Sequence, residues 1–427
     1  MKTKLGSRFW LCLTIFSLMG QIAWVVENMY FNVFIYKMFH ASASDISLMV
    51  AASAVTATLT TVLMGALSDR VGKRKLFISA GYLMWGISIL SFVLLREDII
   101  SAVFGMTLSA ATVGVTLTIV LDCVMTFFGS TANDAAFNAW LTDATDQTNR
   151  GAAEGINAMM PLVSILVVFG GFMFFNLEKA SSWSWIFAII GGITMIIGVL
   201  GFALIKEPPI QPVKEPYIKS VLYGFRPSTM KKYPALYLAL GAFILFNISI
   251  QIFMPYLIIY YEVALGMKDY VLIMAPAIVL ASIVTALWGR VFDKKGFTFS
   301  GLIAIIALLL GYGVLYATKT TLPVFIGSLL MMSGYLAGMA VFGAQIRKHT
   351  PEGKSGRLQG VRIFSQVLIP GVVGPFIGER VLKNAQMITN NDGTTSFVPN
   401  HNIFLAAAIA LVTVLPLVWV ISRKKAK

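Results

Sequence analysis

Long apolar segments separated by short polar ones run along the whole chain. Each apolar segment is close to the roughly 20 residues that cross a bilayer as an α-helix. We therefore predict twelve transmembrane helices, at residues 9–36, 45–67, 76–95, 118–141, 157–177, 184–205, 235–261, 270–292, 300–318, 322–346, 362–382 and 403–422. The pattern indicates an all-α membrane protein.

One long polar segment interrupts this pattern and sets the domain organisation. Within residues 206–233, a run of prolines breaks any helix that begins there: Pro208, Pro209, Pro212 and Pro216. We predict an N-terminal six-helix bundle at 1–205, a cytoplasmic linker at 206–233 and a C-terminal six-helix bundle at 234–427. Within the linker, Tyr217 to Phe225 is predicted to form a short helix on the membrane surface.

Composition supports the same class of protein. The chain is 57% hydrophobic and 12% charged, which is far more apolar than a soluble domain. Strands with alternating polarity are absent from the pattern, which argues against an outer-membrane barrel. No catalytic nucleophile–base pair, phosphate-binding loop or metal-ligand spacing is visible, so we expect neither an enzyme nor a cofactor or metal.

The distribution of basic residues predicts the orientation. With the N-terminus inside, 26 of the 33 Lys and Arg residues fall in cytoplasmic segments and 7 in outer loops. Helical membrane proteins concentrate these residues on the cytoplasmic side. We expect both termini in the cytoplasm and the chain in a bacterial inner membrane. The net charge of +14 is then topological and does not indicate a nucleic-acid partner.

An apolar segment at 97–117 does not fit twelve spans. Gly65 and Gly289 begin two similar loops 224 residues apart, whereas a second pair of similar loops, at Gly151 and Gly356, is 205 residues apart. The first half therefore holds about 19 extra residues. We predict a helix extension or a re-entrant piece on the outer face. The alternative is a fourth span at 99–120 with the extra residues inside.

The loop after the second predicted span carries the most distinctive motif. It reads Gly65-Ala-Leu-Ser-Asp69-Arg70-Val-Gly72-Lys73-Arg74-Lys75, and a partial copy reads Gly289-Arg-Val-Phe-Asp293-Lys294-Lys-Gly296. The first glycine of each copy permits close packing of a neighbour, and the second permits a tight turn. The aspartate can pair with a basic residue or with a helix terminus.

This motif resembles the signature loop of the major facilitator superfamily of secondary transporters. The resemblance implies two pseudo-symmetric six-helix bundles, a cavity between them near the bilayer midplane, and transport by alternating access. It also implies a cytoplasmic gate that stabilises the outward-facing state, formed by Gly65, Asp69, Arg70, Gly72, Lys73 and Arg74. In the second copy, Phe297 and Thr298 replace Lys73 and Arg74.

Polar residues follow one face of the first predicted helix. Gln21, Trp24, Asn28 and Asn32 recur at spacings of three and four, with Glu27 at the edge of the stripe. An ionisable residue at this depth costs about 2.5–3.5 kcal/mol on insertion scales and requires compensation. We predict that the stripe lines a solute cavity. The alternative is a set of interhelical hydrogen bonds.

The fourth predicted helix carries a wider polar face. Its residues recur every four positions, with one more on the same side: Asp122, Thr126, Ser130, Asn133, Asp134 and Asn138. Such a face cannot point at lipid. We predict that it faces the cavity, with Ser130, Asn133 and Asp134 near mid-depth. The seventh helix, the counterpart of the first by repeat, adds Asn247 and Gln251.

The end of the fourth helix carries a second, looser resemblance. Asn138 to Gly151, which includes Asp143 and Arg150, resembles the same region of cation-coupled sugar symporters of the glycoside–pentoside–hexuronide group. The resemblance implies that Asp143 and Arg150 help to hold an inner gate. Those symporters bind their cation through acidic residues in the second span, and residues 46–67 contain none.

We hypothesise a symporter of a small polar solute such as a sugar or glycoside, driven by H+ or Na+ bound at Glu27 or Asp134. Carboxyl groups at such depth can exchange protons or bind a cation. The expected partners are that solute and the lipid bilayer, and the chain is expected to act as a monomer. A proton-coupled multidrug exporter is the alternative, and a membrane-embedded enzyme or a sensor is a third class.

Overall fold

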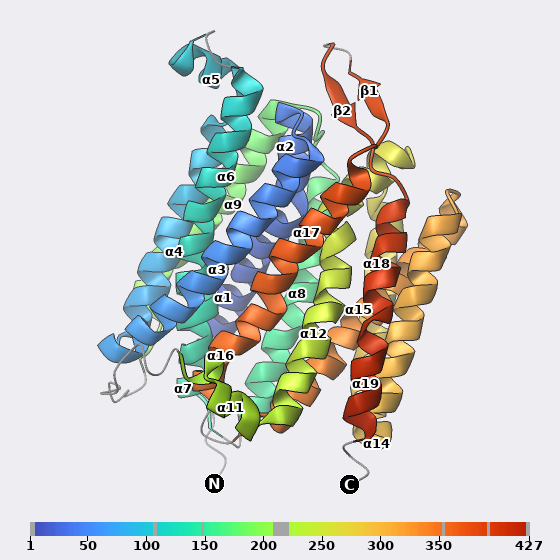
Figure 1. The fold of residues 1–427 in the computed structure, drawn as a ribbon. Helices are drawn as coiled ribbons and strands as arrows, with labels where there is room; N and C mark the ends of the chain where they lie inside the picture. Colours follow the sequence, from blue (N-terminus) through green and yellow to red (C-terminus); the bar gives the residue numbers. More distant parts are fainter. Residues whose placement is uncertain are drawn as a thin grey trace. The chain divides into compact units, whose positions relative to one another are not determined.

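A computed structural model describes residues 5–105, 109–146, 149–207, 222–351, 355–390 and 393–423. The described chain is almost entirely helical (Figure 1). It divides into two compact units, unit 1 (Met1–Ala41 and Ala52–Val221) and unit 2 (Ser42–Ala51 and Leu222–Lys427). Helix α3 passes through both, because its first nine residues belong to unit 2.

Unit 1 is built from long helices, some of which change pitch along their length. Its elements are α1 (Ser7–Val25), the π-helical turn η1 (Val26–Tyr30), α2 (Phe31–Phe39), α3 (Ala43–Val71), α4 (Arg74–Ser91), η2 (Phe92–Leu94), α5 (Glu97–Phe104), α6 (Ala110–Gly129), the π-helical segment η3 (Ser130–Phe137), α7 (Asn138–Asp143), α8 (Arg150–Phe172) and α9 (Ala180–Leu204). Helices α1, η1 and α2 form one continuous span, as do α6, η3 and α7.

Unit 2 repeats this plan and adds a small β-hairpin. Its elements are η4 (Leu222–Phe225), α11 (Pro227–Lys232), α12 (Pro234–Phe253), η5 (Met254–Tyr256), α13 (Leu257–Ile259), η6 (Tyr260–Ala264), α14 (Val271–Ala317), α15 (Thr321–His349), α16 (Ser355–Ile363), η7 (Phe364–Leu368), α17 (Ile369–Leu382), β1 (Met387–Thr389), β2 (Thr395–Phe397), α18 (Asn402–Val412) and α19 (Val414–Arg423). The strands pair antiparallel, with Met387 opposite Phe397.

The predicted spans and the predicted fold class are confirmed. In the described parts of the chain, eleven helical segments are long and apolar enough to cross a membrane. The longest, Val271–Ala317, contains non-helical Gly296 at φ 77°. It therefore comprises two helices, which match the predicted spans at 270–292 and 300–318. Every predicted span thus has its own helix.

Helix ends differ from the prediction where polar residues continue a helix. Helix α8 begins at Arg150 and ends at Phe172, whereas 157–177 was predicted. Hydropathy marks the part of a helix that lies among apolar groups, but backbone hydrogen bonds continue through its polar ends. The short helix α11 and the hairpin were not predicted. Most of the helix predicted at 217–225 lies outside the described residues, and its end, Leu222–Phe225, is a 3-10 turn.

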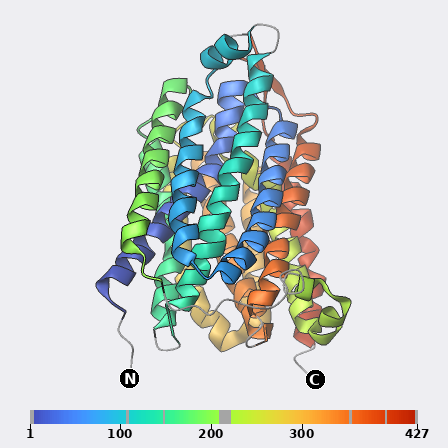
Figure 2. The ribbon, with the colours of Figure 1, turned by 90° about the vertical axis from the view of Figure 1, so that its left-hand side faces the viewer.

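The extra segment at 97–117 combines a separate helix with a helix extension. Helix α5 ends before Gly105, whose φ of 71° suits glycine, and α6 begins at Ala110 after the cap residue Ser109. The views in Figures 1 and 2 place α5 at the end of α6 that lies away from α7. The span then runs from Ala110 to Asp143. The extension is confirmed for 110–117, and the alternative fourth span at 99–120 is wrong.

Glycines let α4 and α9 of unit 1 approach closely. A Cβ atom added to Gly86 would lie 2.7 Å from the carbonyl oxygen of Gly191, and one added to Gly191 would lie 2.9 Å from the backbone nitrogen of Leu90. Small residues at such positions let the backbones of membrane helices come together. Neither contact can be relieved by a side-chain rotation, because the neighbouring atoms belong to the backbone.

Replacement of Gly86 by valine is therefore expected to separate α4 from α9. Overpacking of this kind costs about 1–3 kcal/mol. The matched control is Gly192→Val in α9, because a Cβ atom there would meet nothing within 4 Å. Thermal unfolding of the purified protein in detergent should show a lower midpoint for Gly86→Val only. Equal midpoints would contradict the packing described here.

Candidate functional site

Glu27 is buried inside unit 1 in the middle of the first span. It lies in η1, with 6% of its surface exposed. Its Oε1 atom accepts hydrogen bonds from Ser53 Oγ of α3 at 2.6 Å and from Thr126 Oγ1 of α6 at 2.9 Å. The two hydroxyl oxygens are 2.9 Å apart. Three helices thus meet at one carboxylate oxygen, while Glu27 Oε2 is buried without a partner.

Asp122 is the second buried carboxyl group of this region. It lies in α6, one turn before Thr126, and is 2% exposed. Its Oδ1 atom is buried and has no hydrogen-bond partner. The side chain lies near Ser53 and close enough to Glu27 for the two carboxyl groups to interact electrostatically. Glu27, Asp122, Ser53 and Thr126 are called the carboxyl cluster below.

Asp134 belongs to a separate polar group further along the same span. It lies in η3 and is partly exposed. Ser130 Oγ donates to its Oδ2 at 3.1 Å, Asn133 Nδ2 lies 3.4 Å from its Oδ1, and the Trp24 side chain lies against it. Tyr82 of α4 donates to Asn133 Oδ1 at 3.0 Å and thereby fixes that amide. The carboxyl group of Asp134 is therefore surrounded by donors.

The remaining polar residues of the first span, and Asn138 of the fourth span, include both buried and exposed side chains. Asn28 is exposed and donates to the carbonyl of Trp24, and Asn32 is buried and donates to the carbonyl of Asn28. Gln21 and Trp24 are partly exposed. Asn138 is exposed and donates to the carbonyls of Asn133 and Asp134. The stripe thus includes buried and open members.

The predicted helical period is wrong at the two most polar places. The prediction assumed 3.6 residues per turn, whereas η1 and η3 are π-helical. The wider turn changes which residues share a face. With this wider turn, Asn28 and Asn138 are exposed while Glu27 and Asn133 are buried. Single π-helical turns are rare and occur often at functional sites.

Asn247 and Gln251 lie in α12 of unit 2. Asn247 is buried and donates to the carbonyl of Phe243 at 2.8 Å. Gln251 is partly buried, and its backbone packs closely against Gly374 of α17. Both residues belong to the other unit, and their role as solute contacts stays a prediction.

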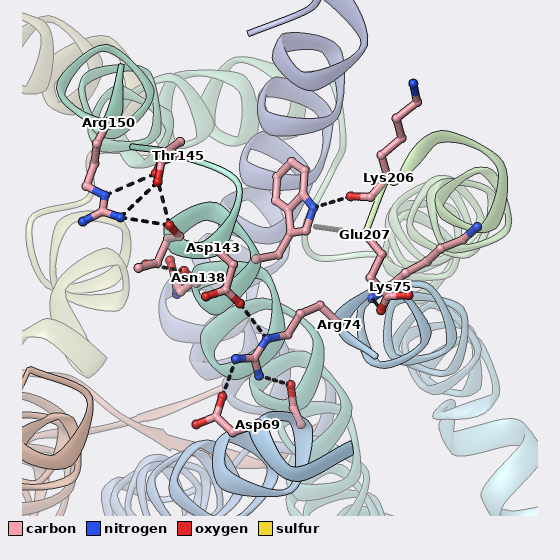
Figure 3. A network of polar contacts seen from close by, with 12 residues as sticks. Asp69, Arg74, Lys75, Asn138, Asp143, Thr145, Arg150, Lys206 and Glu207 are labelled. Atoms are coloured by element: carbon pink, nitrogen blue, oxygen red, sulfur yellow. Dashed lines mark hydrogen bonds and ion pairs between the residues drawn. The ribbon is translucent and has the colours of Figure 1, made fainter. Parts of the chain in front are cut away.

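The motif loop is held by a buried arginine (Figure 3). The side chain of Arg74 is 6% exposed and forms ion pairs with Asp69 of α3 and with Asp143 of α7, the latter at 3.1 Å. It also donates to Ser68 Oγ. Of the two contacts considered for Asp69, a helix terminus or a basic residue, the structure shows the basic residue. Arg70 and Lys73, also predicted as gate residues, are exposed at the surface.

The glycines of the motif behave in two ways. Gly72 has a φ of 68° and Gly296, its counterpart in the second copy, has a φ of 77°, so the predicted tight turns are confirmed. The close packing expected at Gly65 and Gly289 is not found. A Cβ atom at Gly65 would lie 3.7 Å from that of Ala135, and one at Gly289 would meet nothing within 4 Å.

Asp143 and Arg150 do not pair with each other. Arg150 donates instead to the carbonyls of Thr142 and Thr145 at 2.9 and 3.1 Å, and it thus caps the end of α7 (Figure 3). A cation at a helix C-terminus satisfies free carbonyls and the helix dipole. That both residues help to hold a gate stays a prediction. Asp143 contacts the motif loop through Arg74.

Several residues that bind helix ends or the buried carboxyl groups of unit 1 were not predicted from the sequence. Glu207 accepts from the backbone nitrogen of Lys75 at 3.1 Å and caps α4, and Arg8 donates to the carbonyls of Ala203 and Leu204 at the end of α9. Ser53 was missed because α3 contains no acidic residue beside it. The signal available was the recurrence of Ser53, Thr56 and Thr60 at helical spacing.

These helices define an integral membrane protein with acidic groups inside one unit. The model of the Major Facilitator Superfamily matches residues 9–375, and the chain belongs to this superfamily. Its members are transporters rather than enzymes. The resemblance inferred from the motif at Gly65 is thereby confirmed.

Solved structures with the same fold include transporters of different kinds. A bacterial homolog of the human lysosomal transporter Spinster, inward-facing and unoccupied, is 15% identical, with 98% of each chain covered and a TM-score of 0.71. A mutant of the nucleoside transporter NupG is 14% identical, with 96% of this chain and 99% of that chain covered and a TM-score of 0.72. A search of curated proteins found no match.

Replacement of Arg74 by glutamine should destabilise unit 1, because Asp69 and Asp143 lose their cation. Breaking a buried ion pair costs about 3–5 kcal/mol, and we expect about 1–3 kcal/mol because both carboxylates are partly exposed. Lys73→Gln, at the exposed neighbour, should change stability by less than about 0.5 kcal/mol. Thermal unfolding measures both, and an equal effect would refute the role of Arg74.

Proposed function

We propose that this protein is a secondary active symporter that moves a small polar solute, such as a sugar or glycoside, with H+ or Na+ by alternating access. The observation that carries the proposal is that three carboxyl groups lie within the first and fourth spans, away from the helix ends: those of Glu27, Asp122 and Asp134. Ionisable groups inside a membrane protein mark ion or solute pathways, because their burial is costly and is retained for function.

The surroundings of Asp134 suit a hydroxyl-rich solute. Exposed or partly exposed amides and an indole ring lie along the first and fourth spans, at Gln21, Trp24, Asn28 and Asn138. Amide groups both donate and accept, as sugar hydroxyls require, and an aromatic ring offers an apolar face. We infer that Asp134 contacts the solute. Asn247 and Gln251 of unit 2 are proposed as further solute contacts, by analogy with the first span.

The loop around Arg74 is proposed as the gate of this transporter. Arg74 joins α3, α4 and α7 through the carboxylates of Asp69 and Asp143, so a movement of any of these helices must break an ion pair. A bistable contact of this kind can be biased by ligand binding. By the distribution of basic residues, we propose that the loop is cytoplasmic, in a bacterial inner membrane, and that the chain acts as a monomer.

The looser likeness to glycoside–pentoside–hexuronide symporters agrees with a sugar-like solute. It rests on Asp143 and Arg150 and on the surrounding segment. The names of the structural relatives point to different cargoes, since one is a nucleoside transporter and another is related to a lysosomal transporter. The solute class is therefore proposed from the side chains of unit 1.

A panel screen can test the solute class. Purified protein is heated with glucose, lactose, a methyl galactoside, uridine, a dipeptide and ethidium, at several pH values and with or without sodium. A solute that binds the folded state raises the free energy of unfolding, by about 2.7 kcal/mol at a concentration 100 times Kd. The unfolding midpoint rises as a result. We expect a sugar or glycoside to do so. Stabilisation by ethidium alone would favour a drug exporter.

Asp134→Asn should abolish uphill uptake of the stabilising solute into proteoliposomes, because the variant loses a carboxylate that accepts from Ser130 and lies beside Trp24. The control is Asp98→Asn in the exposed helix α5, where Asp98 pairs only locally with Arg96. That variant should accumulate solute like the parent protein. Undiminished accumulation by Asp134→Asn would remove Asp134 from the mechanism.

A further inference from the structure

Tyr82 lies completely buried inside unit 1, where α4 packs against η3. Its hydroxyl group donates to the backbone oxygen of Phe16 at 2.6 Å and to Asn133 Oδ1 at 3.0 Å. The side chain has no exposed surface through which to touch a solute, and it is not part of the carboxyl cluster. Any effect of Tyr82 on solute binding must therefore act through a neighbouring residue.

The hydrogen bond from Tyr82 determines which end of the Asn133 amide faces Asp134. An ionised carboxylate only accepts hydrogen bonds, whereas an amide has one accepting and one donating end. Because Tyr82 donates to the amide oxygen, the Nδ2 group of Asn133 is turned toward Asp134 Oδ1, which lies 3.4 Å away. Without the hydroxyl group, the amide is free to rotate and to present its oxygen to the carboxylate, which repels it.

The backbone leaves space for this bond at Gly20 of α1. A Cβ atom at Gly20 would lie 2.6 Å from the hydroxyl oxygen of Tyr82 and would also overlap Asn133 Oδ1. A larger residue would therefore push the two groups apart. Gly81 of α4 acts in the same way on the helices, because a Cβ atom there would lie 2.6 Å from that of Ala132 in η3.

The ring of Tyr82 belongs to a second support of the same carboxylate. It packs edge-on against Trp85, with the ring centroids 5.4 Å apart, and Trp85 packs against Trp24 at 5.1 Å. Gly129 of α6 leaves room for both indole rings, since a Cβ atom there would lie 2.7 Å from Trp85 and 3.1 Å from Trp24. The Trp24 side chain in turn lies against Asp134. This second support also begins on α4.

We propose that Tyr82 is a positioning residue of the solute site, whose hydroxyl group holds the Asn133 amide in the orientation that fixes Asp134. The inference rests on the proposed function and adds a residue that determines the affinity of its solute site. Asn133 lies on Oδ1 of Asp134 and Ser130 donates to Oδ2, so each carboxylate oxygen is held by one donor. A hydroxyl-rich solute then meets an acceptor in a fixed position, which lowers the entropic cost of binding.

Tyr82→Phe removes the hydroxyl group and keeps the ring. We expect it to raise the Kd of the stabilising solute at least tenfold, because the Asn133 amide loses its fixed orientation. The matched control is Tyr261→Phe in unit 2, which also removes a fully buried hydroxyl group that is hydrogen-bonded to a side chain, that of Ser328 at 2.6 Å. This control should bind the solute like the parent protein. Titration calorimetry of the purified proteins measures both values.

A double-mutant cycle separates positioning from a general loss of stability. If Tyr82 acts through Asn133, Tyr82→Phe should not weaken binding further in a protein that already carries Asn133→Ala. An equal loss in both backgrounds would overturn the proposal, as would an unchanged Kd in Tyr82→Phe. If Tyr82→Phe fails to fold, Gly20→Ala takes its place, because it displaces the same hydroxyl group, and it should likewise raise Kd.

NMR spectroscopy tests the same contact without any solute. In protein with isotope-labelled asparagine side chains, the Nδ2 signal of Asn133 is assigned by its absence in Asn133→Ala. We expect Tyr82→Phe and Asp134→Asn each to shift this signal and Tyr261→Phe to leave it unchanged. An unshifted signal in folded Tyr82→Phe would contradict the positioning role. If the signal shifts but no panel solute binds the parent protein, the positioning contact stands and the proposed function fails.

Discussion

The structure depends on one constraint, which is that polar atoms inside a bilayer must find partners within the protein. The backbone meets this requirement through helices. Many hydroxyl side chains meet it by donating to a carbonyl one turn earlier, as Thr118 does to Gly114 and Thr131 to Phe127. The polar atoms that remain buried without partners are therefore informative, and two of them belong to Glu27 and Asp122.

The same constraint shapes the ends of the helices in unit 1, where the chain returns to water. Charged side chains there bind free helix termini or each other. Arg8 binds carbonyls at the end of α9, Glu207 binds the start of α4 and Arg150 binds the end of α7. Among the described residues of unit 1, Arg74 alone joins more than two helices through ion pairs. The other three residues each bind the end of one helix, whereas Arg74 holds three helices together and is the residue we propose for the gate.

The sequence was sufficient for properties that depend on local pattern. Apolar length located every span, and the need for glycine at positive φ explains why the turns at Gly72 and Gly296 were predicted correctly. Properties that depend on neighbours were not accessible. The π-helical turn at Glu27 and the hydroxyl of Ser53 beside it follow from packing among three helices, which no local pattern encodes. The ion pair of Asp143 with Arg74 depends in the same way on the packing of α4 against α7, and it was not predicted.

The central claim is that acidic groups inside unit 1 link the movement of H+ or Na+ to that of a solute. The most direct measurement uses proteoliposomes that receive the stabilising solute together with an imposed inward gradient of H+ or of Na+. The account predicts that one of the two gradients drives accumulation of the solute above its outer concentration. Solute entry that responds to neither gradient would contradict it.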